Sequence, residues 1–468
     1  MSDDLYVHQL LRASMNVLPP SQRRAGILLH PTSLPSGTLA DVVRWLDFLQ
    51  ASGCTVWQML PLGVPLTGLS PYQCASAFAV NPALFPEVRA DMRSFPRWCR
   101  AQHHWLEDYA RFMVMKQLHN GASWVEWPEA LRRRDPAALA AFNQQHEVAL
   151  IAVKTEQYRA YAHWQGIRQA ASARGILLFG DMPIFVAHDS ADVWAHPTQF
   201  LLDEAGMPTV VTGVPPDYFS ATGQRWGNPH YNWAVMHEQG FGWWLDRLRS
   251  HFEWFDLVRI DHFRGLAAAW TIPAADDTAI NGSWQPVPGA ALLQKIQDEM
   301  GEIPLVAEDL GVITDDVIAL RRDFHLPGMA VLQFAFDAHA DNPHKPENVS
   351  PETVYFTGTH DNDTTLGWYT SLAEEVRHQV RLQLNAADAG QVLDAMCSTV
   401  LTSRAQMAVL PLQDVLRLGS EARMNTPGTI SGNWNWRFDW DMLMPSLAPS
   451  LLDQLQKAHR CEPNLLPA

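Results

Sequence analysis

The length, composition and charge of this chain favour a large globular protein with a neutral ligand. Its 468 residues include 34 basic and 50 acidic side chains, and the resulting formal charge of −16 argues against nucleic acid or an anionic membrane as a partner. Apolar residues make up 47% and charged residues only 18% of the chain, which excludes an intrinsically disordered protein. The start of the chain is acidic, no apolar stretch reaches 18 residues, and the five cysteines are scattered, so we expect a cytoplasmic protein.

Short apolar runs recur along the whole chain, and each has the length of a buried strand. Helical patterns lie between several of them; for example, aromatic and apolar residues recur from Tyr158 to Ile167, and Gly175 ends that helix before the next run. The runs, in chain order, span 25–30, 55–61, 176–182, 255–261, 304–308, 329–334, 353–358 and 406–411. Eight strands that alternate with helices predict an α/β fold, a (β/α)8 TIM barrel that extends over 1–468.

Two of the gaps between these runs are too long for a simple crossover. They follow the second and the third strand, and they predict inserted, mainly helical subdomains at 67–170 and 187–250, around the C-terminal mouth of the barrel. The second insertion contains the segment 213–229, which is rich in Gly, Pro, aromatic and amide residues. Such a composition is typical of a binding loop, and we expect this loop to cover the substrate.

Three of the predicted strands lead into carboxylates. Asp261 closes the fourth strand, Glu308 the fifth, and Asp361 follows the seventh. Because TIM-barrel enzymes carry their catalytic groups just beyond the C-terminal ends of the strands, we expect these three side chains to converge on one pocket. Arg259 shares a strand face with Asp261, so it could keep that carboxylate ionised as a nucleophile; a structural ion pair at the barrel rim is the alternative.

The other two carboxylates also allow two interpretations each. The apolar surroundings of Glu308 would raise its pKa and suit a general acid/base, but Glu308 or the adjacent Asp309 could instead cap a helix. His360 and Asp361 could bind vicinal hydroxyls, or they could belong to an ordinary turn. The chain order of an arginine-paired Asp, a Glu and a His-Asp pair favours the catalytic interpretation. Two carboxylates on opposite sides of a glycosidic bond are what retaining glycoside chemistry requires.

Longer motifs resemble one enzyme family over nearly the whole chain. They run from 26–35 (GILLHPTSLP) to 423–437 (RMNTPGTISGNWNWR). In these motifs the chain is similar to the 4-alpha-glucanotransferases, or amylomaltases, of the alpha-amylase clan. The resemblance implies retaining transfer of an alpha-1,4-glucan segment from a donor maltodextrin to the 4-hydroxyl of an acceptor glucan or of glucose. It implies no cofactor and no metal, because side chains alone supply the chemistry.

The resemblance also implies roles for individual residues. Asp261 would be the nucleophile that forms a covalent glycosyl-enzyme, Glu308 the acid/base, and Asp361 the carboxylate that stabilises the distorted sugar. Further residues would bind the substrate or assist these three, namely Arg259, His360, Ser70, Tyr72, Asp181, Asp217, Gln224, Trp226, Asp309 and Asn433. Trp226 is also a candidate without the resemblance, because indole rings stack on glucose and this one lies in a polar, glycine-rich loop.

The sequence departs from the family pattern at one place, and it leaves two alternative functions open. After Pro35 the chain lacks the longer glycine-rich loop that is usual in the family, which bears on acceptor preference and product size. A retaining alpha-glucan hydrolase would share all the catalytic residues and differ in the access of water. A non-catalytic glucan-binding protein would usually have lost one of the three carboxylates, and this chain keeps them all. Because the predicted covering loop is retained, we expect transfer to prevail over hydrolysis.

Overall fold

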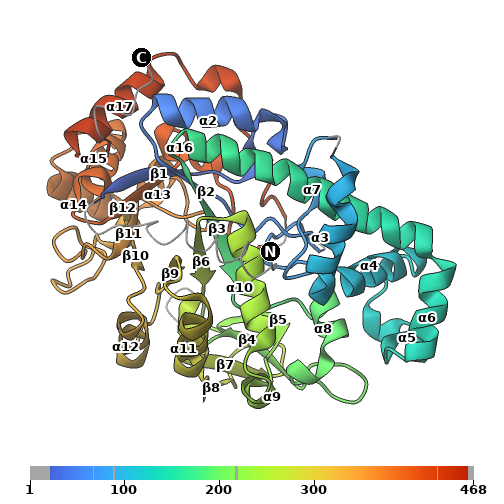
Figure 1. Ribbon diagram of the computed structural model, residues 1–468. Coiled ribbons are helices and arrows are strands. Elements are labelled where there is room, and N and C mark those ends of the chain that lie inside the picture. Colours follow the sequence, from blue (N-terminus) through green and yellow to red (C-terminus); the bar gives the residue numbers. More distant parts are fainter. Residues whose placement is uncertain (1–21, 67, 88–89, 217–219, 430, 462–468) are drawn as a thin grey trace.

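The centre of the molecule is an eight-stranded parallel sheet that curls into a barrel, with helices around it (Figure 1). The computed structural model describes residues 22–66, 68–87, 90–216, 220–429 and 431–461. The barrel strands are β1 (Arg24–Leu28), β2 (Val56–Gln58), β3 (Leu177–Pro183), β6 (Leu257–Asp261), β9 (Leu305–Ala307), β10 (Gly328–Val331), β11 (Thr353–Phe356) and β12 (Met407–Pro411). Each overlaps one of the predicted runs, and the predicted TIM barrel is confirmed.

The order of the strands places the polar strand ends side by side. The sheet runs β10-β11-β12-β1-β2-β3-β6-β9, and every neighbouring pair is parallel. Its two ends meet where the Ala307 N–H donates to the Pro327 carbonyl at 2.8 Å, which closes the barrel. In the register of β3 with β6, Asp181 lies beside Arg259 and Pro183 beside Asp261. The C-terminal ends of β3 and β6 therefore lie at the same end of the barrel.

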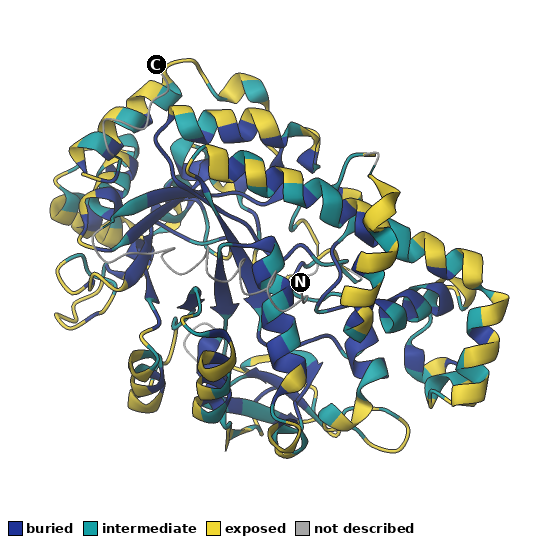
Figure 2. Cartoon of the chain, in the orientation of Figure 1, coloured by how far each residue is buried: buried dark blue, intermediate teal, exposed yellow. Residues whose placement is uncertain are grey.

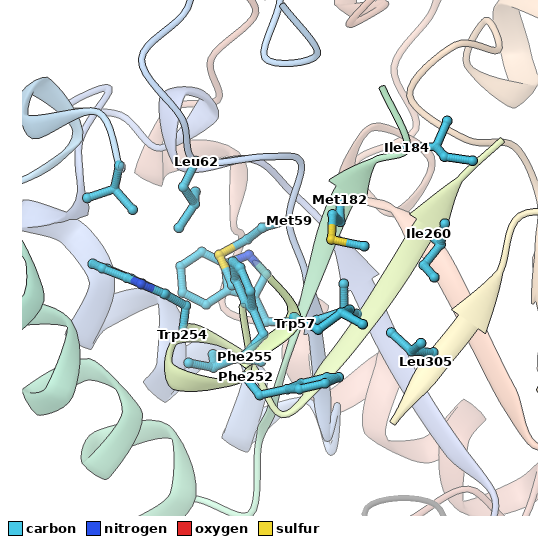
Figure 3. Close-up of a cluster of buried hydrophobic side chains, with 14 of the residues drawn as sticks. Trp57, Met59, Leu62, Met182, Ile184, Phe252, Trp254, Phe255, Ile260 and Leu305 are labelled. Atoms are coloured by element: carbon cyan, nitrogen blue, oxygen red, sulfur yellow. The ribbon is translucent and has the colours of Figure 1, made fainter. Parts of the chain in front are cut away.

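The strands read as continuous apolar runs because both of their faces are buried. In β11, Val354 and Phe356 belong to the cluster inside the barrel, whereas Tyr355 belongs to the layer between strands and helices. Figure 2 shows this layering, with buried strands inside helices whose outer faces are exposed. Figure 3 shows part of the outer layer, where Trp57 on β2 packs near Phe252 and Phe255; Trp57 is fully buried, as its apolar strand predicts.

Helices cover the barrel, and the helix predicted to stop at Gly175 does so. The longest, α7, ends two residues before Gly175, which has a left-handed φ of +68°. In the part of the chain that the structure describes, no helix is long and apolar enough to cross a membrane. The helices outside the two insertions are α2 (Val42–Ala51), α11 (Gly289–Met300), α12 (Asp315–Asp323), α13 (Thr365–Ser371), α14 (Glu374–Leu384), α15 (Ala389–Thr402), α16 (Leu412–Val415) and α17 (Leu447–Lys457).

The two long gaps hold more elements than a single crossover helix. Between β2 and β3 lie α3 (Phe95–Ala101), α4 (His103–Leu118), α5 (Glu129–Arg132), α6 (Pro136–Gln145) and α7 (Glu147–Ala173). Between β3 and β6 lie α8 (Ala191–Ala195), β4 (Val210–Val214), β5 (Gln224–Pro229), α9 (Trp233–Glu238) and α10 (Gly242–Trp254). The bounds 67–170 and 187–250 stay predictions.

A second, antiparallel sheet was not predicted from the sequence. Its order is β5-β4-β7-β8, with β7 (Ala268–Pro273) and β8 (Ser283–Pro286) following β6 in the chain. Strands β5 and β8 are polar and only partly buried, so no apolar run marks them, whereas β4 and β7 contain apolar residues, including the buried Val211 and Ile272. Much of the predicted loop 213–229 is therefore strand, and its residues 217–219, with the candidate Asp217, lie outside the described residues.

Candidate active site

The three candidate carboxylates lie around one cavity at the C-terminal mouth of the barrel. Asp261 is the last residue of β6, Glu308 follows β9, and Asp361 follows β11. All three line a cavity of about 790 Å³. The structure thus brings together three groups that lie on three different strands, as parallel strand ends in a closed barrel must.

Asp261 is held by an arginine from its own strand. Arg259 Nη2 donates to Asp261 Oδ1 at 2.7 Å, and Arg259 Nε donates to Asp181 Oδ1 at 3.0 Å. Arg259 is only 3% exposed, and Asp181 only 1%. Burial raises the pKa of Asp261, while Arg259 opposes that shift and favours the charged form. The ion pair orients one carboxylate oxygen and leaves the group at the cavity surface, an arrangement suited to a nucleophile.

Tyr72 connects this ion pair to the other side of the cavity. Its hydroxyl donates to Asp181 Oδ2 at 2.7 Å, lies 2.9 Å from His360 Nε2 and accepts from Arg259 Nη2 at 3.3 Å. The Tyr72 ring stacks on the His360 ring with centroids 5.2 Å apart. Burial lowers the pKa of His360, so the neutral ring can donate its Nε2–H to Tyr72. Asp181 itself does not line the cavity and acts on it through Tyr72 and Arg259.

Glu308 is held by backbone groups. The His262 N–H donates to Glu308 Oε2 at 2.6 Å, and the Leu310 N–H donates to Oε1 at 2.9 Å. His262 reaches this position through a left-handed backbone, with a φ of +55° directly after β6. Burial raises the pKa of Glu308, although Arg259 and the two N–H groups oppose the shift. Asp261 thus contacts a cation, whereas Glu308 accepts hydrogen bonds from two backbone N–H groups.

Asp361 faces the cavity from a more exposed position. Its side chain is 51% exposed, and its Oδ1 lies 3.4 Å from His360 Nε2. Asn425 Nδ2 donates to the same oxygen at 2.6 Å, and Arg423 Nη2 donates to the Asp361 backbone carbonyl at 2.7 Å. The segment with Asn425 therefore fixes this carboxylate while leaving its second oxygen available to a ligand.

Four further candidates line the same cavity, namely Ser70, Gln224, Trp226 and Asn433. Trp226 Nε1 donates to Gln224 Oε1 at 3.1 Å, and the indole ring meets the His262 ring edge-on with centroids 4.8 Å apart. The Asn433 Oδ1 accepts from the Thr426 N–H at 2.9 Å. These contacts hold the rim of the cavity in place.

Asp309 does not line the cavity with the other candidates. Its Oδ1 accepts from the Met329 N–H at 2.7 Å, and its Oδ2 lies 3.0 Å from Arg321 Nε. The sequence-based interpretation expected substrate contact here. The structure instead shows a carboxylate that braces β10 and α12 against the end of β9.

Sequence reasoning missed several residues of the cavity wall. His262 directly follows Asp261, and Asn425 and Trp434 lie within the quoted motif 423–437, so position alone could have suggested them. Phe185 has no such signal, because an apolar residue after a strand reads as core.

The fold and the cavity define a class of protein before any relative is considered. A TIM barrel whose mouth carries an Asp held by Arg259 and a Glu held by backbone N–H groups has the paired carboxylates of an enzyme that acts on glycosidic bonds.

Comparison with known proteins places the chain within that class. The sequence profile of the family described as 4-alpha-glucanotransferase matches residues 28–89 and 85–443. The 4-alpha-glucanotransferase of Thermus thermophilus is 47% identical over 474 residues, covering 89% of this chain and 94% of that protein. The Synechocystis enzyme of the same name is 42% identical over 479 residues, covering 90% and 95%. The chain therefore belongs to the 4-alpha-glucanotransferase family and is an enzyme of that class.

Solved structures agree with this assignment. The amylomaltase from Streptococcus agalactiae, in complex with acarbose, superposes with a TM-score of 0.90 at 31% identity, covering 94% of this chain and 100% of that one. The amylomaltase from Corynebacterium glutamicum gives a TM-score of 0.75 at 17% identity, covering 97% of this chain and 76% of that one, which shows a shared fold.

Proposed function

We propose that this enzyme transfers a segment of an alpha-1,4-glucan from a donor maltodextrin to the 4-hydroxyl of an acceptor glucan or of glucose, with retention of configuration. The observation that carries the proposal is the contrast between two carboxylates in one cavity. Burial raises the pKa of both groups, but Arg259 contacts Asp261 at 2.7 Å and favours its charge, whereas Glu308 accepts from the backbone N–H groups of His262 and Leu310. One group is prepared to attack and the other to donate a proton.

The reaction then follows in two steps. Asp261 attacks the anomeric carbon of the donor while Glu308 donates a proton to the glycosidic oxygen; the bond from carbon to oxygen breaks and an ester to Asp261 forms. In the second step Glu308 takes the proton of the acceptor 4-hydroxyl, whose oxygen displaces Asp261. Asp361 and His360 bind vicinal hydroxyls of the distorted sugar. Every step uses side chains alone.

The walls of the cavity support a glucan as the substrate. Aromatic rings of Tyr72, Trp226 and Trp434 line it, and such rings stack on the apolar faces of sugars. The volume of about 790 Å³ suits several sugar units. We further propose a cytoplasmic location, since the five cysteines are odd in number and scattered along the chain. Neither nucleic acid nor a membrane is needed as a partner.

The covalent step can be tested by trapping. The Glu308→Gln variant, incubated with alpha-maltotriosyl fluoride, should gain the mass of one maltotriosyl group, because fluoride leaves without acid help but the ester needs a base for its removal. Peptide mass spectrometry should place that group on Asp261. The double variant Asp261→Asn with Glu308→Gln is the control and should gain no mass. A label on another residue, or none on Glu308→Gln, would refute the mechanism.

A further inference from the structure

A second cavity lies behind one wall of the active site. It has a volume of about 60 Å³, and Tyr72, Asp181 and Arg247 are among the residues that line it. Pro183 and Phe185 line both this inner cavity and the active-site cavity, so the segment 183–185 separates the two. A void on one side removes close packing from that side, and the wall needs other contacts to hold its position.

Arg247 supplies these contacts from α10. Its side chain donates through Nη2 to the Pro183 carbonyl and through Nη1 to the Ile184 carbonyl at 3.2 Å. Nη1 also donates to the hydroxyl oxygen of Tyr231 at 3.3 Å, and that hydroxyl donates to the same Ile184 carbonyl at 2.7 Å. The planar guanidinium thus binds two successive carbonyls just where the pairing of β3 with β6 ends at Pro183.

The position of this buried charge is itself fixed from several sides. Arg247 is only 2% exposed, and its guanidinium carbon lies 5.3 Å from the ring centroids of both Trp243 and Trp244. A buried cation is costly unless it is well contacted, and two aromatic faces with three hydrogen-bond acceptors provide such contact. A shorter or uncharged side chain could not reproduce this set.

Aromatic contacts connect the segment 183–185 to the backbone group that holds Glu308. The Phe185 ring lies 6.4 Å from the Trp226 ring, and the Trp226 ring lies 4.8 Å from that of His262. The N–H of His262 donates to Glu308. Because Glu308 protonates the leaving oxygen and later deprotonates the acceptor hydroxyl, side chains on its side of the cavity face the acceptor sugar.

We propose that Arg247 is a positioning residue for the acceptor half of the reaction. It fixes the segment 183–185, and through Phe185 and Trp226 it fixes the surface against which the acceptor sugar binds. This inference rests on the proposed transfer function. It assigns Arg247 no contact with the substrate and no part in forming the covalent intermediate.

The test separates the two half-reactions. With alpha-maltotriosyl fluoride as donor and glucose as acceptor, the Arg247→Met variant should show a KM for glucose raised by about fivefold or more. Its rate constant for fluoride release in a single turnover should change by less than about twofold, because Asp261 and Arg259 are untouched. Arg247→Lys, which keeps the charge but not the two-carbonyl geometry, should fall between Arg247→Met and the wild type.

Arg460 offers a matched control at the opposite end of the barrel. It is also only 2% exposed and donates to the carbonyls of Arg24, Ser403 and Ala405 at 2.9, 3.0 and 2.9 Å, but it lines neither cavity. Arg460→Met should lower Tm as Arg247→Met does, yet leave the KM for glucose unchanged. Equal KM values in the wild type and both Arg247 variants would overturn the inference.

Misfolding of Arg247→Met and a lack of transfer by the wild type are two further outcomes, and each can be told apart from equal KM values. If Arg247→Met does not fold, Arg247→Lys and Tyr231→Phe decide, because Tyr231→Phe removes one hydrogen bond to the wall; wild-type KM values in both would overturn the inference. If the wild type itself transfers nothing to glucose or to maltodextrins, the proposed function fails, whatever the Arg247 variants do.

Discussion

The hydroxyl of Tyr72 forms hydrogen bonds with three polar side chains of the active site. A hydroxyl can donate only one hydrogen bond, and that of Tyr72 goes to Asp181, so Arg259 and His360 must both donate to it. Arg259 and Asp261 lie on the same face of one strand, so their contact could be predicted from the sequence. The contact between Tyr72 and Asp181 joins residues 109 positions apart, and it could not be predicted because no local pattern encodes it.

The buried Glu308 predicts a characteristic pH dependence. Burial raises its pKa, and the first step needs its protonated form, so kcat/KM on maltotriose should fall as pH rises through a pKa above the ordinary value of about 4.3. With alpha-maltotriosyl fluoride, whose leaving group needs no acid, the same fall should be absent from single-turnover rates. Matching profiles for both donors would show that Glu308 is not the acid.

At the scale of elements, the burial of a strand decides whether it can be recognised from the sequence. The barrel strands are buried on both faces and stand out as apolar runs, whereas the second sheet buries only a small cluster around Val211 and Ile272, and its strands β5 and β8 are polar. Strand ends could be located to within a few residues. Which of two adjacent carboxylates turns into the cavity depends on the neighbouring strand, and Asp309 shows this because it turns toward β10.

This position of Asp309 predicts a structural effect. Asp309→Ala removes the acceptor of the Met329 N–H and the ion-pair partner of Arg321, and should lower the free energy of unfolding by about 1–3 kcal/mol. Asp309→Asn, which keeps an acceptor oxygen, should cost less. Thermal melting and the KM for maltotriose are the measurements. A raised KM at an unchanged Tm would restore the substrate-binding role that the family resemblance implies.

The junction of α4 with α10 predicts a pH-dependent stability. Burial raises the pKa of Glu253 to about 7, and Gln102 Nε2 donates to its carboxylate at 3.0 Å. The folded protein binds this proton more tightly than the unfolded chain, so the contribution of Glu253 to stability falls as pH rises from about 4.5 to about 7.

Glu253→Gln removes that titration while keeping the shape of the side chain. At pH 8 the variant should be more stable than the wild type by about 1–3 kcal/mol, and at pH 4 the difference should vanish or reverse. Tm values measured across this pH range check the prediction. A difference that does not change with pH would mean that Glu253 does not titrate in the folded protein.

At the scale of the whole molecule, the active site is assembled from segments far apart in the chain. The cavity is lined by residues from Gly68 to Trp434, and barrel closure between β9 and β10 brings its two sides together. Eight apolar runs sufficed to predict that barrel. The wall formed by 183–185 and the contact of Asn425 with Asp361 depend on long-range packing, which the sequence does not encode locally. The turn after Pro35 contributes no residue to the cavity lining.

The central claim is that a glucan, and not water, completes the reaction. Product analysis by mass spectrometry after incubation with maltotriose alone, beside the Asp261→Asn variant, tests it most directly. We predict glucose together with a series of longer maltodextrins from the wild type, and no conversion by the variant. Glucose and maltose without longer products would contradict transfer and identify a hydrolase, and no turnover by the wild type would favour a glucan-binding role.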